Sequence, residues 1–289
     1  MNCIVARFGE IGTKSFQTRV WWEKLLVQNL KACLRENDIE FEDISNKKGR
    51  IIVYTKKEKA LKALKNVFGI VSLSKAYRIN ANLDEIKREC LRLFSEYKSK
   101  KNLENPRFRV SVRRITKDFA LSSQQVAVIL GSHILENEKC SVDLENYEIE
   151  LSLEFLEDDC FIFFEKLRGY GGLPVGVQGE VLCILENENS LVAAWMMLKR
   201  GCDLMVLGEK KLAQSLLKFS SGHEIKVFKD FSSALKRKPK ALVLGSTLEN
   251  IELESFNFEI PIFTPLLGLK NDEIEEIKRI LGLPQPKNL

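Results

Sequence analysis

A short polar segment stands where a nucleotide-binding domain would carry out its chemistry, and it reads Glu186, Asn187, Glu188, Asn189 and Ser190. The apolar run 181–185 precedes it and a helix expected over 191–200 follows, which is the strand, loop and helix order of a nucleotide-binding α/β domain. Such loops hold phosphate because glycines let backbone N–H groups approach it at a helix N-terminus. Here two carboxylates and no glycine form the connection, so a triphosphate would meet like charge and Cβ atoms. The segment therefore has the strand, loop and helix layout of an ATP site but lacks the glycines that would let backbone amides approach phosphate.

The sequence on both sides of this segment resembles the ThiI-type tRNA 4-thiouridine synthetases, a family of tRNA sulfurtransferases. In that family a GGLPVG-type stretch precedes a pyrophosphatase loop that reads SGGxDS. Here GGLPVGVQG at 171–179 is intact, but the loop reads ENENS, one residue shorter and without the two glycines and the aspartate. Further likeness lies in RFGEIGTKS at 7–15 with Arg19, in LGSTLEN at 244–250 and in PIFTPLLG at 261–268. The resemblance covers almost the full length and implies a ThiI-like fold with a degenerate ATP loop.

Cysteine and histidine offer little material for another catalytic site. The seven cysteines form no CxxC pair and most lie in apolar contexts, so we expect buried free thiols. Cys183 lies in an apolar strand, Cys202 follows a helix end whose dipole opposes thiolate formation, and the resembled family's persulfide-forming cysteine has no counterpart. His133 and His223 fall in different expected domains. We therefore expect no catalytic residue, no metal ligand and no bound cofactor.

The distribution of charge indicates a polyanionic partner. The 289 residues have a net charge of +5, but residues 1–117 hold 27 Lys and Arg against 13 Asp and Glu, whereas the remainder holds 18 against 27. A basic front half favours nucleic acid, because each phosphate that Lys or Arg neutralises releases counterions. A solvated lysine-rich surface is the alternative that charge alone leaves open.

The first expected domain, residues 1–75, has strands at 3–8, 39–45, 50–54 and 71–76 and helices at 20–36 and 58–67. Two helices against a four-stranded antiparallel sheet form a ferredoxin-like arrangement. Trp22 shares a helical stripe with Leu26 and Leu30, so we expect it in the core rather than as a platform for base stacking. A weaker group of expected phosphate contacts comes from this domain: Lys14, Arg19, Lys47, Lys48 and Arg50.

The second expected domain, residues 76–168, has helices at 83–97 and 124–135 and strands at 108–114, 142–153 and 160–165. Its order and the stretches 108–117 and Asn146-Tyr147 resemble the THUMP domain, an RNA-binding module of tRNA-modifying enzymes. The resemblance implies binding to the acceptor end of tRNA, led by backbone shape rather than base edges. The strand expected at 108–114 alternates apolar and basic residues, so its basic side chains share one face, which suits a row of phosphate contacts. The expected contacts are Arg109, Arg113, Arg114 and Lys117.

The third expected domain, residues 175–289, alternates strands at 181–185, 204–206, 225–228 and 241–244 with helices at 191–200, 210–219, 231–236 and 272–281. This order predicts a small, doubly wound parallel sheet. The whole chain is thus an α/β protein with an α+β N-terminal half. The last residues, 283–289, have the composition of a loose tail or an exchange arm.

Three functions fit these features. The first is a tRNA-binding adaptor that targets a separate tRNA-modifying enzyme, since it accounts for both the basic half and the degenerate loop. The second is an ATP-dependent tRNA sulfurtransferase that acts through a non-standard site. The third is a homodimeric RNA chaperone, which the sequence does not separate from the first. No long apolar window or leader-like N-terminus is present, so we expect a cytoplasmic protein without membrane contact.

Overall fold

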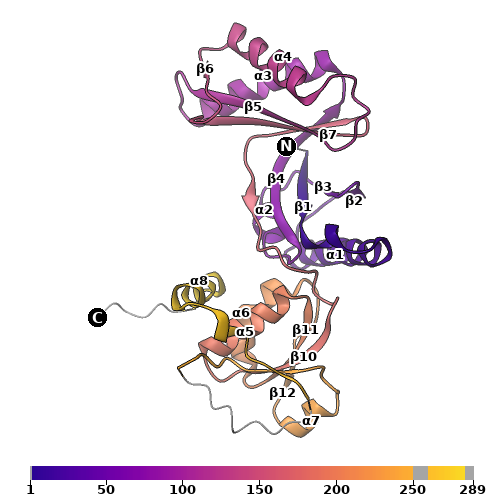
Figure 1. The fold of residues 1–289 in the computed structure, drawn as a ribbon, viewed down its shortest axis with the longest axis vertical. Coiled ribbons are helices and arrows are strands. Elements are labelled where there is room, and N and C mark those ends of the chain that lie inside the picture. The colour runs from indigo at the N-terminus through magenta and orange to yellow at the C-terminus, as the bar shows by residue number, and fades with distance from the viewer. Residues whose placement is uncertain (1, 250–259, 284–289) are drawn as a thin grey trace, which may run out of the picture. The chain divides into compact units, whose positions relative to one another are not determined.

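The computed structural model describes residues 2–249 and 260–283 (Figure 1). It divides into two compact units. The first comprises the chain up to Arg7, Glu40–Leu61 and Ser72–Arg168, and the second comprises Phe8–Ile39, Lys62–Val71 and the chain from Gly169. The end of the LGSTLEN stretch at Asn250 and the tail 284–289 lie outside the described residues.

The first unit is built on one sheet, whose strand order among the described residues is β2-β3-β1-β4-β8-β7-β5-β6, with β9 also paired to β4. The pairs β2–β3, β1–β3, β4–β8, β4–β9 and β7–β8 are antiparallel, whereas β5 runs parallel to both β6 and β7. The strands are β1 (Cys3–Phe8), β2 (Asp43–Lys47), β3 (Arg50–Tyr54), β4 (Ile70–Asn80), β5 (Arg107–Arg114), β6 (Ser141–Val142), β7 (Ile149–Leu156), β8 (Asp159–Phe163) and β9 (Leu167–Arg168).

Two helices, α3 (Leu83–Lys100) and α4 (Ser123–Asn137), lie on the same face of the β5–β7–β8 part of this sheet (Figure 1). Their apolar stripes explain the packing, since Phe94 of α3 and Leu130 of α4 share a buried cluster with Phe108 of β5. Both helices begin at a side-chain cap. The Asn82 side chain accepts two amide hydrogen bonds at the start of α3, and Ser122 forms a capping box at the start of α4.

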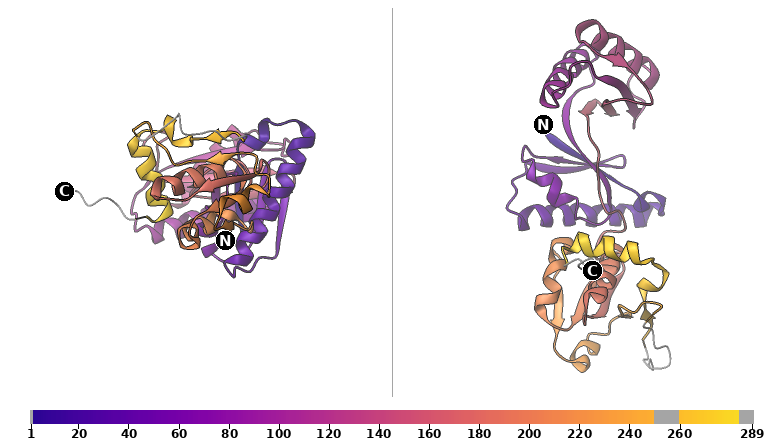
Figure 2. Two further views of the ribbon diagram at one scale, coloured as in Figure 1. Left: turned by 90° about the horizontal axis from the view of Figure 1, so that it is seen from below. Right: turned by 90° about the vertical axis from the view of Figure 1, so that its left-hand side faces the viewer.

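The second unit contains a five-stranded parallel sheet in the order β12-β11-β10-β13-β14. Helix α7 packs on one face of this sheet, where it contacts the strand residues Leu182 and Met205. Helices α5, α6 and α8 pack on the other face (Figure 2). This covering of both faces explains why the strands are nearly continuous apolar runs. The strands are β10 (Gly179–Ile184), β11 (Cys202–Leu207), β12 (Lys226–Phe228), β13 (Leu242–Val243) and β14 (Ile262–Phe263). The helices are η1 (Glu10–Thr13), α1 (Phe16–Glu36), α2 (Lys59–Leu64, which the unit boundary crosses), α5 (Glu188–Lys199), α6 (Lys210–Ser220), α7 (Phe231–Leu235), η3 (Pro265–Gly268) and α8 (Asn271–Leu281).

The intact GGLPVG stretch has a structural part in this unit. Gly172 has a φ of +77°, and a Cβ there would lie 2.2 Å from the carbonyl oxygen of Lys199 at the end of α5. The Leu173 N–H donates to the same oxygen at 2.9 Å. The stretch therefore holds the chain against the C-terminus of α5, where only glycine fits.

The predicted architecture is confirmed: an N-terminal α+β half built on one sheet, and a C-terminal parallel sheet with helices on both faces. One predicted element is wrong, because the strand expected over 142–153 is two strands, β6 and β7. The Asp143 side chain accepts hydrogen bonds from the amides of Glu145 and Asn146, and this turn interrupts the extended backbone. The domain boundary expected near residue 75 falls inside β4. No helix in the described part of the chain is long and apolar enough to cross a bilayer.

Candidate nucleic-acid interface and nucleotide loop

The basic residues of β5 divide into anchored and open ones. Arg109 donates to Glu150 at 2.9 Å and to the Leu144 carbonyl oxygen at 3.3 Å, and its guanidinium lies 4.0 Å from the ring centre of Tyr147. Arg114 donates to the carbonyl oxygens of Phe119 and Leu121, at 2.9 and 3.0 Å, so that it holds the loop after the strand. These two arginines already have structural partners.

Arg113 and Lys117 are different, because both are exposed. Neither has an ion-pair partner within the described part of the chain. Phe108, Val110 and Val112 face the apolar cluster as the alternation predicted, which places Arg113 on the other face of the sheet. Arg113 and Lys117 are thus the members of the strongest predicted group that are most available to a phosphate.

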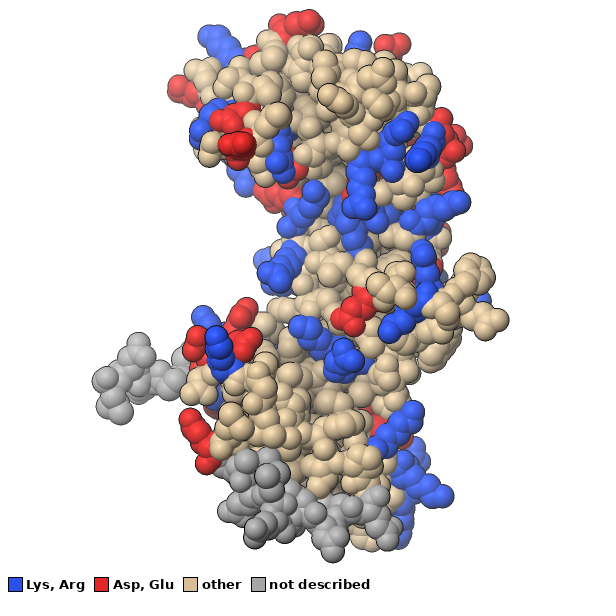
Figure 3. Space-filling model, in the orientation of Figure 1, with Lys and Arg blue, Asp and Glu red and all other residues tan. Residues whose placement is uncertain are grey.

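The turn between β2 and β3 supplies a second basic group in the first unit. Lys47 forms an ion pair with Glu157 at 2.9 Å, and Lys48 is exposed with a φ of +45° at the turn itself. Arg50 is less available than the sequence suggested, because its side chain is only 11% exposed and it is paired with Glu154. Lys and Arg side chains gather over the strands of this unit on the face drawn in Figure 3.

Lys14 and Arg19 lie in the second unit, near the start of α1. The exposed ammonium of Lys14 lies 5.2 Å from the ring centre of Trp22, and Arg19 pairs with Glu23 at 2.6 Å. Trp22 is 6% exposed, which confirms the prediction that it belongs to the core. Its neighbour Trp21 is 52% exposed, and the stripe pattern gave no reason to single it out.

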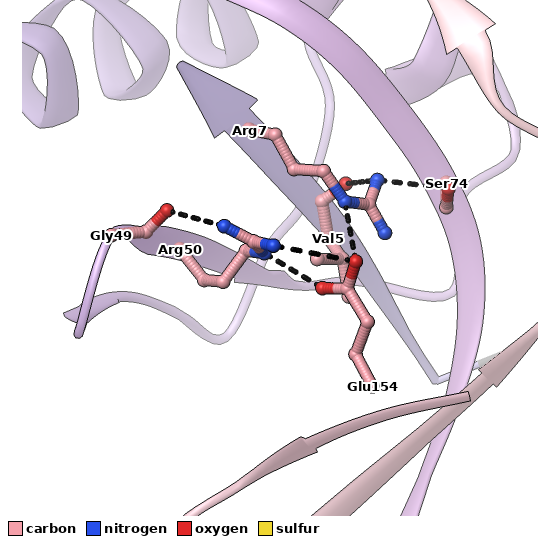
Figure 4. Close-up of polar contacts among 6 residues, drawn as sticks. All are labelled: Val5, Arg7, Gly49, Arg50, Ser74 and Glu154. Carbon is pink, nitrogen blue, oxygen red and sulfur yellow. Dashed lines mark hydrogen bonds and ion pairs between the residues drawn. The ribbon is translucent and has the colours of Figure 1, made fainter. Parts of the chain in front are cut away.

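A buried ion cluster in the first unit was not predicted from the sequence (Figure 4). The Glu154 carboxylate of β7 accepts from Arg7 of β1 at 2.9 Å and from Arg50 of β3 at 2.7 Å. Burial alone would raise the pKa of the Glu154 carboxyl, but the two guanidiniums outweigh this and hold the pKa below its usual value. Burial lowers the pKa of the Arg7 guanidinium, and Glu154 opposes that change. No sequence pattern reveals such pairing across the sheet.

The polar loop between β10 and α5 is closed upon itself. Asn187 is the N-cap of α5, and its side chain accepts from the Ser190 amide at 3.1 Å. The Ser190 hydroxyl accepts from the amides of Glu186 and Asn187, at 3.0 and 3.1 Å, and donates to the Asn187 carbonyl oxygen at 2.6 Å. Three amides at this helix start, those of Glu186, Asn187 and Ser190, therefore already have partners within the loop.

Two neighbours restrict this loop further. A Cβ on Gly245, which follows β13, would lie 2.4 Å from the Ser190 backbone nitrogen, so the two backbones are in close contact. Glu188 lies 3.6 Å from the ammonium of Lys278 on α8. Gly245 belongs to the LGSTLEN stretch, and here it packs against the helix start.

The cysteines and histidines lie in surroundings that suit packing and hydrogen bonding rather than catalysis. Burial raises the pKa of the Cys202 thiol to about 11, and it raises that of Cys183 as well, so neither is a ready nucleophile. The predicted free thiols are confirmed, and six of the seven are buried. His223 bonds to Asp203 at 2.6 Å and to Asn29 at 3.1 Å, and His133 is half-buried on α4. Within residues 2–249 and 260–283, no His, Cys, Asp and Glu side chains cluster as metal ligands would.

The sequence comparisons decide the family. Residues 3–74 match the family model of the ThiI ferredoxin-like domain, and residues 80–165 match that of the THUMP domain. A Thermococcus kodakarensis protein named a probable tRNA sulfurtransferase is 35% identical over 340 positions, which cover 97% of this chain and 88% of that protein. The chain belongs to the ThiI-type tRNA sulfurtransferase family.

A further curated relative and two solved structures are also similar to this chain. A probable tRNA sulfurtransferase from Methanocaldococcus jannaschii is 32% identical and covers 96% of this chain and 87% of its own length. The crystal structure of PH1313 from Pyrococcus horikoshii matches with a TM-score of 0.90 at 36% identity, over 98% of this chain and 100% of that one. A 4-thiouridine synthetase crystallised with RNA and ATP shares the fold, with a TM-score of 0.81 at 22% identity over 98% of this chain and 85% of that one.

The Thermococcus alignment spans 340 positions against the 289 residues of this chain. That ThiI-type relative therefore has aligned sequence for which this chain has no counterpart.

Proposed function

We propose that this ThiI-type chain is a tRNA-binding adaptor that presents the acceptor end of tRNA to a separate modifying enzyme and does not use ATP itself. The observation that carries the proposal is the closed loop at residues 186–190, in which the amides of Glu186, Asn187 and Ser190 bond to side chains of the loop itself. ATP-dependent thiolation would need those amides for phosphate. The raised pKa values of Cys183 and Cys202 add that no ready sulfur carrier replaces the missing one.

Support for tRNA binding comes from the THUMP match and from the open cations Arg113, Lys117 and Lys48 of the first unit. A solved relative with the same fold was crystallised with RNA. Contacts of this kind follow the backbone, as suits A-form RNA. We further propose that Lys14 and Arg19 add weaker contacts to tRNA. We also propose domain boundaries near residues 75 and 168–175. The protein would work in the cytoplasm, as a monomer or a homodimer.

Two measurements test the proposal. Labelled total tRNA should bind with nanomolar to low micromolar affinity that falls steeply with salt and exceeds the affinity for a CCA-truncated tRNA and for a DNA duplex. Millimolar ATP with magnesium should leave the melting temperature unchanged, whereas ATP at a hundredfold over its dissociation constant would add about 2.7 kcal/mol of stability. A clear ATP-induced rise would refute the adaptor function, and equal binding to DNA would refute the tRNA function.

The second candidate is an ATP-dependent tRNA sulfurtransferase that acts through a non-standard site. It is favoured by relatives that carry this name and align over almost all of the chain. Conversion of uridine to 4-thiouridine by the purified protein, with ATP and a persulfide donor, would establish it in place of the adaptor.

A further inference from the structure

The junction between the ferredoxin-like strands and the THUMP strands of the first unit contains a buried charge cluster (Figure 4). Glu154 comes from THUMP strand β7, whereas Arg7 and Arg50 come from β1 and β3 of the ferredoxin-like part. Arg50 grips both carboxylate oxygens, with its Nε 2.7 Å from Oε2 and its Nη2 3.4 Å from Oε1, and Arg7 Nε lies 2.9 Å from Oε1. One carboxylate thus joins two parts that are far apart in the sequence.

The three charged side chains of the cluster are buried. The side chains of Arg7, Arg50 and Glu154 are 10%, 11% and 6% exposed. Arg7 also donates to the Ser74 hydroxyl at 3.0 Å, and its guanidinium lies 4.8 Å from the ring centre of Phe163. Charges this deeply buried are tolerated only when they are paired, so Glu154 is the group that permits both guanidiniums to be there.

The rest of the junction is apolar. Apolar packing alone would not fix one arrangement of the ferredoxin-like strands relative to the THUMP strands. Cys3, Val5 and Ile52 of the ferredoxin-like strands share a buried cluster with Phe161 and Phe163 of the THUMP strands. Apolar contacts are non-directional, whereas a carboxylate between two guanidinium forks has a single good geometry. Buried polar groups of this kind are best known for setting register.

The open cations lie on both sides of this junction. Lys48 is on the β2–β3 turn, and Arg113 on β5 is directly opposite Glu154 in the β5–β7 register. The Glu154 carboxylate is bonded to Arg7 and Arg50. An RNA backbone presents phosphates at fixed spacings, so cations that are already fixed relative to each other bind it with less loss of freedom.

We propose that Glu154 is a positioning residue for tRNA binding: through Arg7 and Arg50 it locks the ferredoxin-like strands to the THUMP strands, so that the cations of both meet one RNA backbone. This inference rests on the proposed tRNA binding. It assigns Arg50 to the protein junction rather than to a phosphate.

The test compares Glu154→Gln with Glu150→Gln. Glu150 is on the same strand, but its partners Arg109 and Ser111 both come from β5, within THUMP. Each substitution removes one negative charge, so a simple charge effect would strengthen tRNA binding in both variants. Positioning predicts the opposite for Glu154→Gln alone, a dissociation constant raised about tenfold. The slope of log affinity against log salt should stay as in the wild type, because the same phosphates are met in the complex.

Binding is measured with total tRNA on protein whose circular dichroism shows it folded at the assay temperature. If Glu154→Gln does not fold, Arg50→Lys takes its place, since it keeps the charge and loses the two-point grip; the same weakening at unchanged slope is expected. Unchanged or tighter binding, an equal loss in Glu150→Gln, or a slope reduced by one would each overturn the positioning role. Absence of tRNA binding by the wild type would instead refute the proposed function.

Discussion

Replacement of Ser190 by alanine gives the most direct measure of how firmly the loop before α5 is closed. The hydroxyl takes part in three hydrogen bonds, two accepted at 3.0 and 3.1 Å and one donated at 2.6 Å, in a residue that is 4% exposed. At about 1 kcal/mol each these bonds contribute about 3 kcal/mol. The higher helix propensity of alanine offsets about 0.5 kcal/mol of this loss. Water can also hydrogen-bond to the freed amide of exposed Glu186, which reduces the loss further. We expect a net loss of about 2 kcal/mol.

Thermal unfolding followed by circular dichroism should show this loss as a melting temperature lower by about 4–8 °C, since a unit of this size shifts by about 2–4 °C per kcal/mol. Ser215→Ala in α6 is the matched control, because its hydroxyl makes one long bond of 3.4 Å to Leu212 and its loss should change little. Ser190→Ala should still not bind ATP, since Gly245 stays against the helix start. Equal melting temperatures for Ser190→Ala and the wild type would refute the closed loop, and ATP binding by the variant would show that the close contact of Gly245 with the helix start does not exclude ATP.

Four further outcomes follow from the structure. Arg113→Ala should weaken binding to all tRNAs about equally and lower the salt slope by about one, and an unchanged slope would remove Arg113 from the contacts. Because folding lowers the pKa of the Glu154 carboxyl, its stabilisation is present above pH ~4.5 and is lost as the pH falls through the folded-state pKa; acid unfolding should thus be steeper in the wild type than in Glu154→Gln. Cys202, with a pKa of about 11, should resist iodoacetamide at pH 7.5 until the protein is unfolded, and rapid labelling of the native protein would contradict its burial. Gly172→Ala should lower the melting temperature clearly, because its Cβ would overlap the Lys199 carbonyl oxygen; an unchanged value would show that the backbone can yield there.

Local signals in the sequence predicted most elements well. The bounds of β1 and β3 are those expected, and the Ser122 cap marks the start of α4. The sequence was less informative about where some elements begin and end: the Asp143 turn divides an apparently continuous strand, and α1 begins at Phe16 rather than at residue 20. Apolar periodicity reports which face is buried, but it does not report turns made by single side chains.

The candidate interface was predictable as a list of cations but not as an arrangement. Arginine spacing on β5 predicted the open face on which Arg113 stands, because alternation in a strand is local. The partner of Arg50 is 104 residues away, and the partners of Arg109 and Arg114 lie in loops and on a neighbouring strand. Pairing of this kind, across strands for Arg50 and Arg109 and within the following loop for Arg114, determines which cations are available to RNA, and residue spacing in the sequence does not reveal it.

Strand β4 bears on how this protein could be divided or recombined. The ferredoxin-like match ends at residue 74 and the THUMP match begins at residue 80, yet β4 runs without a break through Asn80 and pairs Tyr77 with Ile162 of β8. A cut between the matches would split one strand and leave its ladder half-formed on both fragments. Recombination at this point should yield insoluble halves, so the two segments are best exchanged between relatives as a single piece.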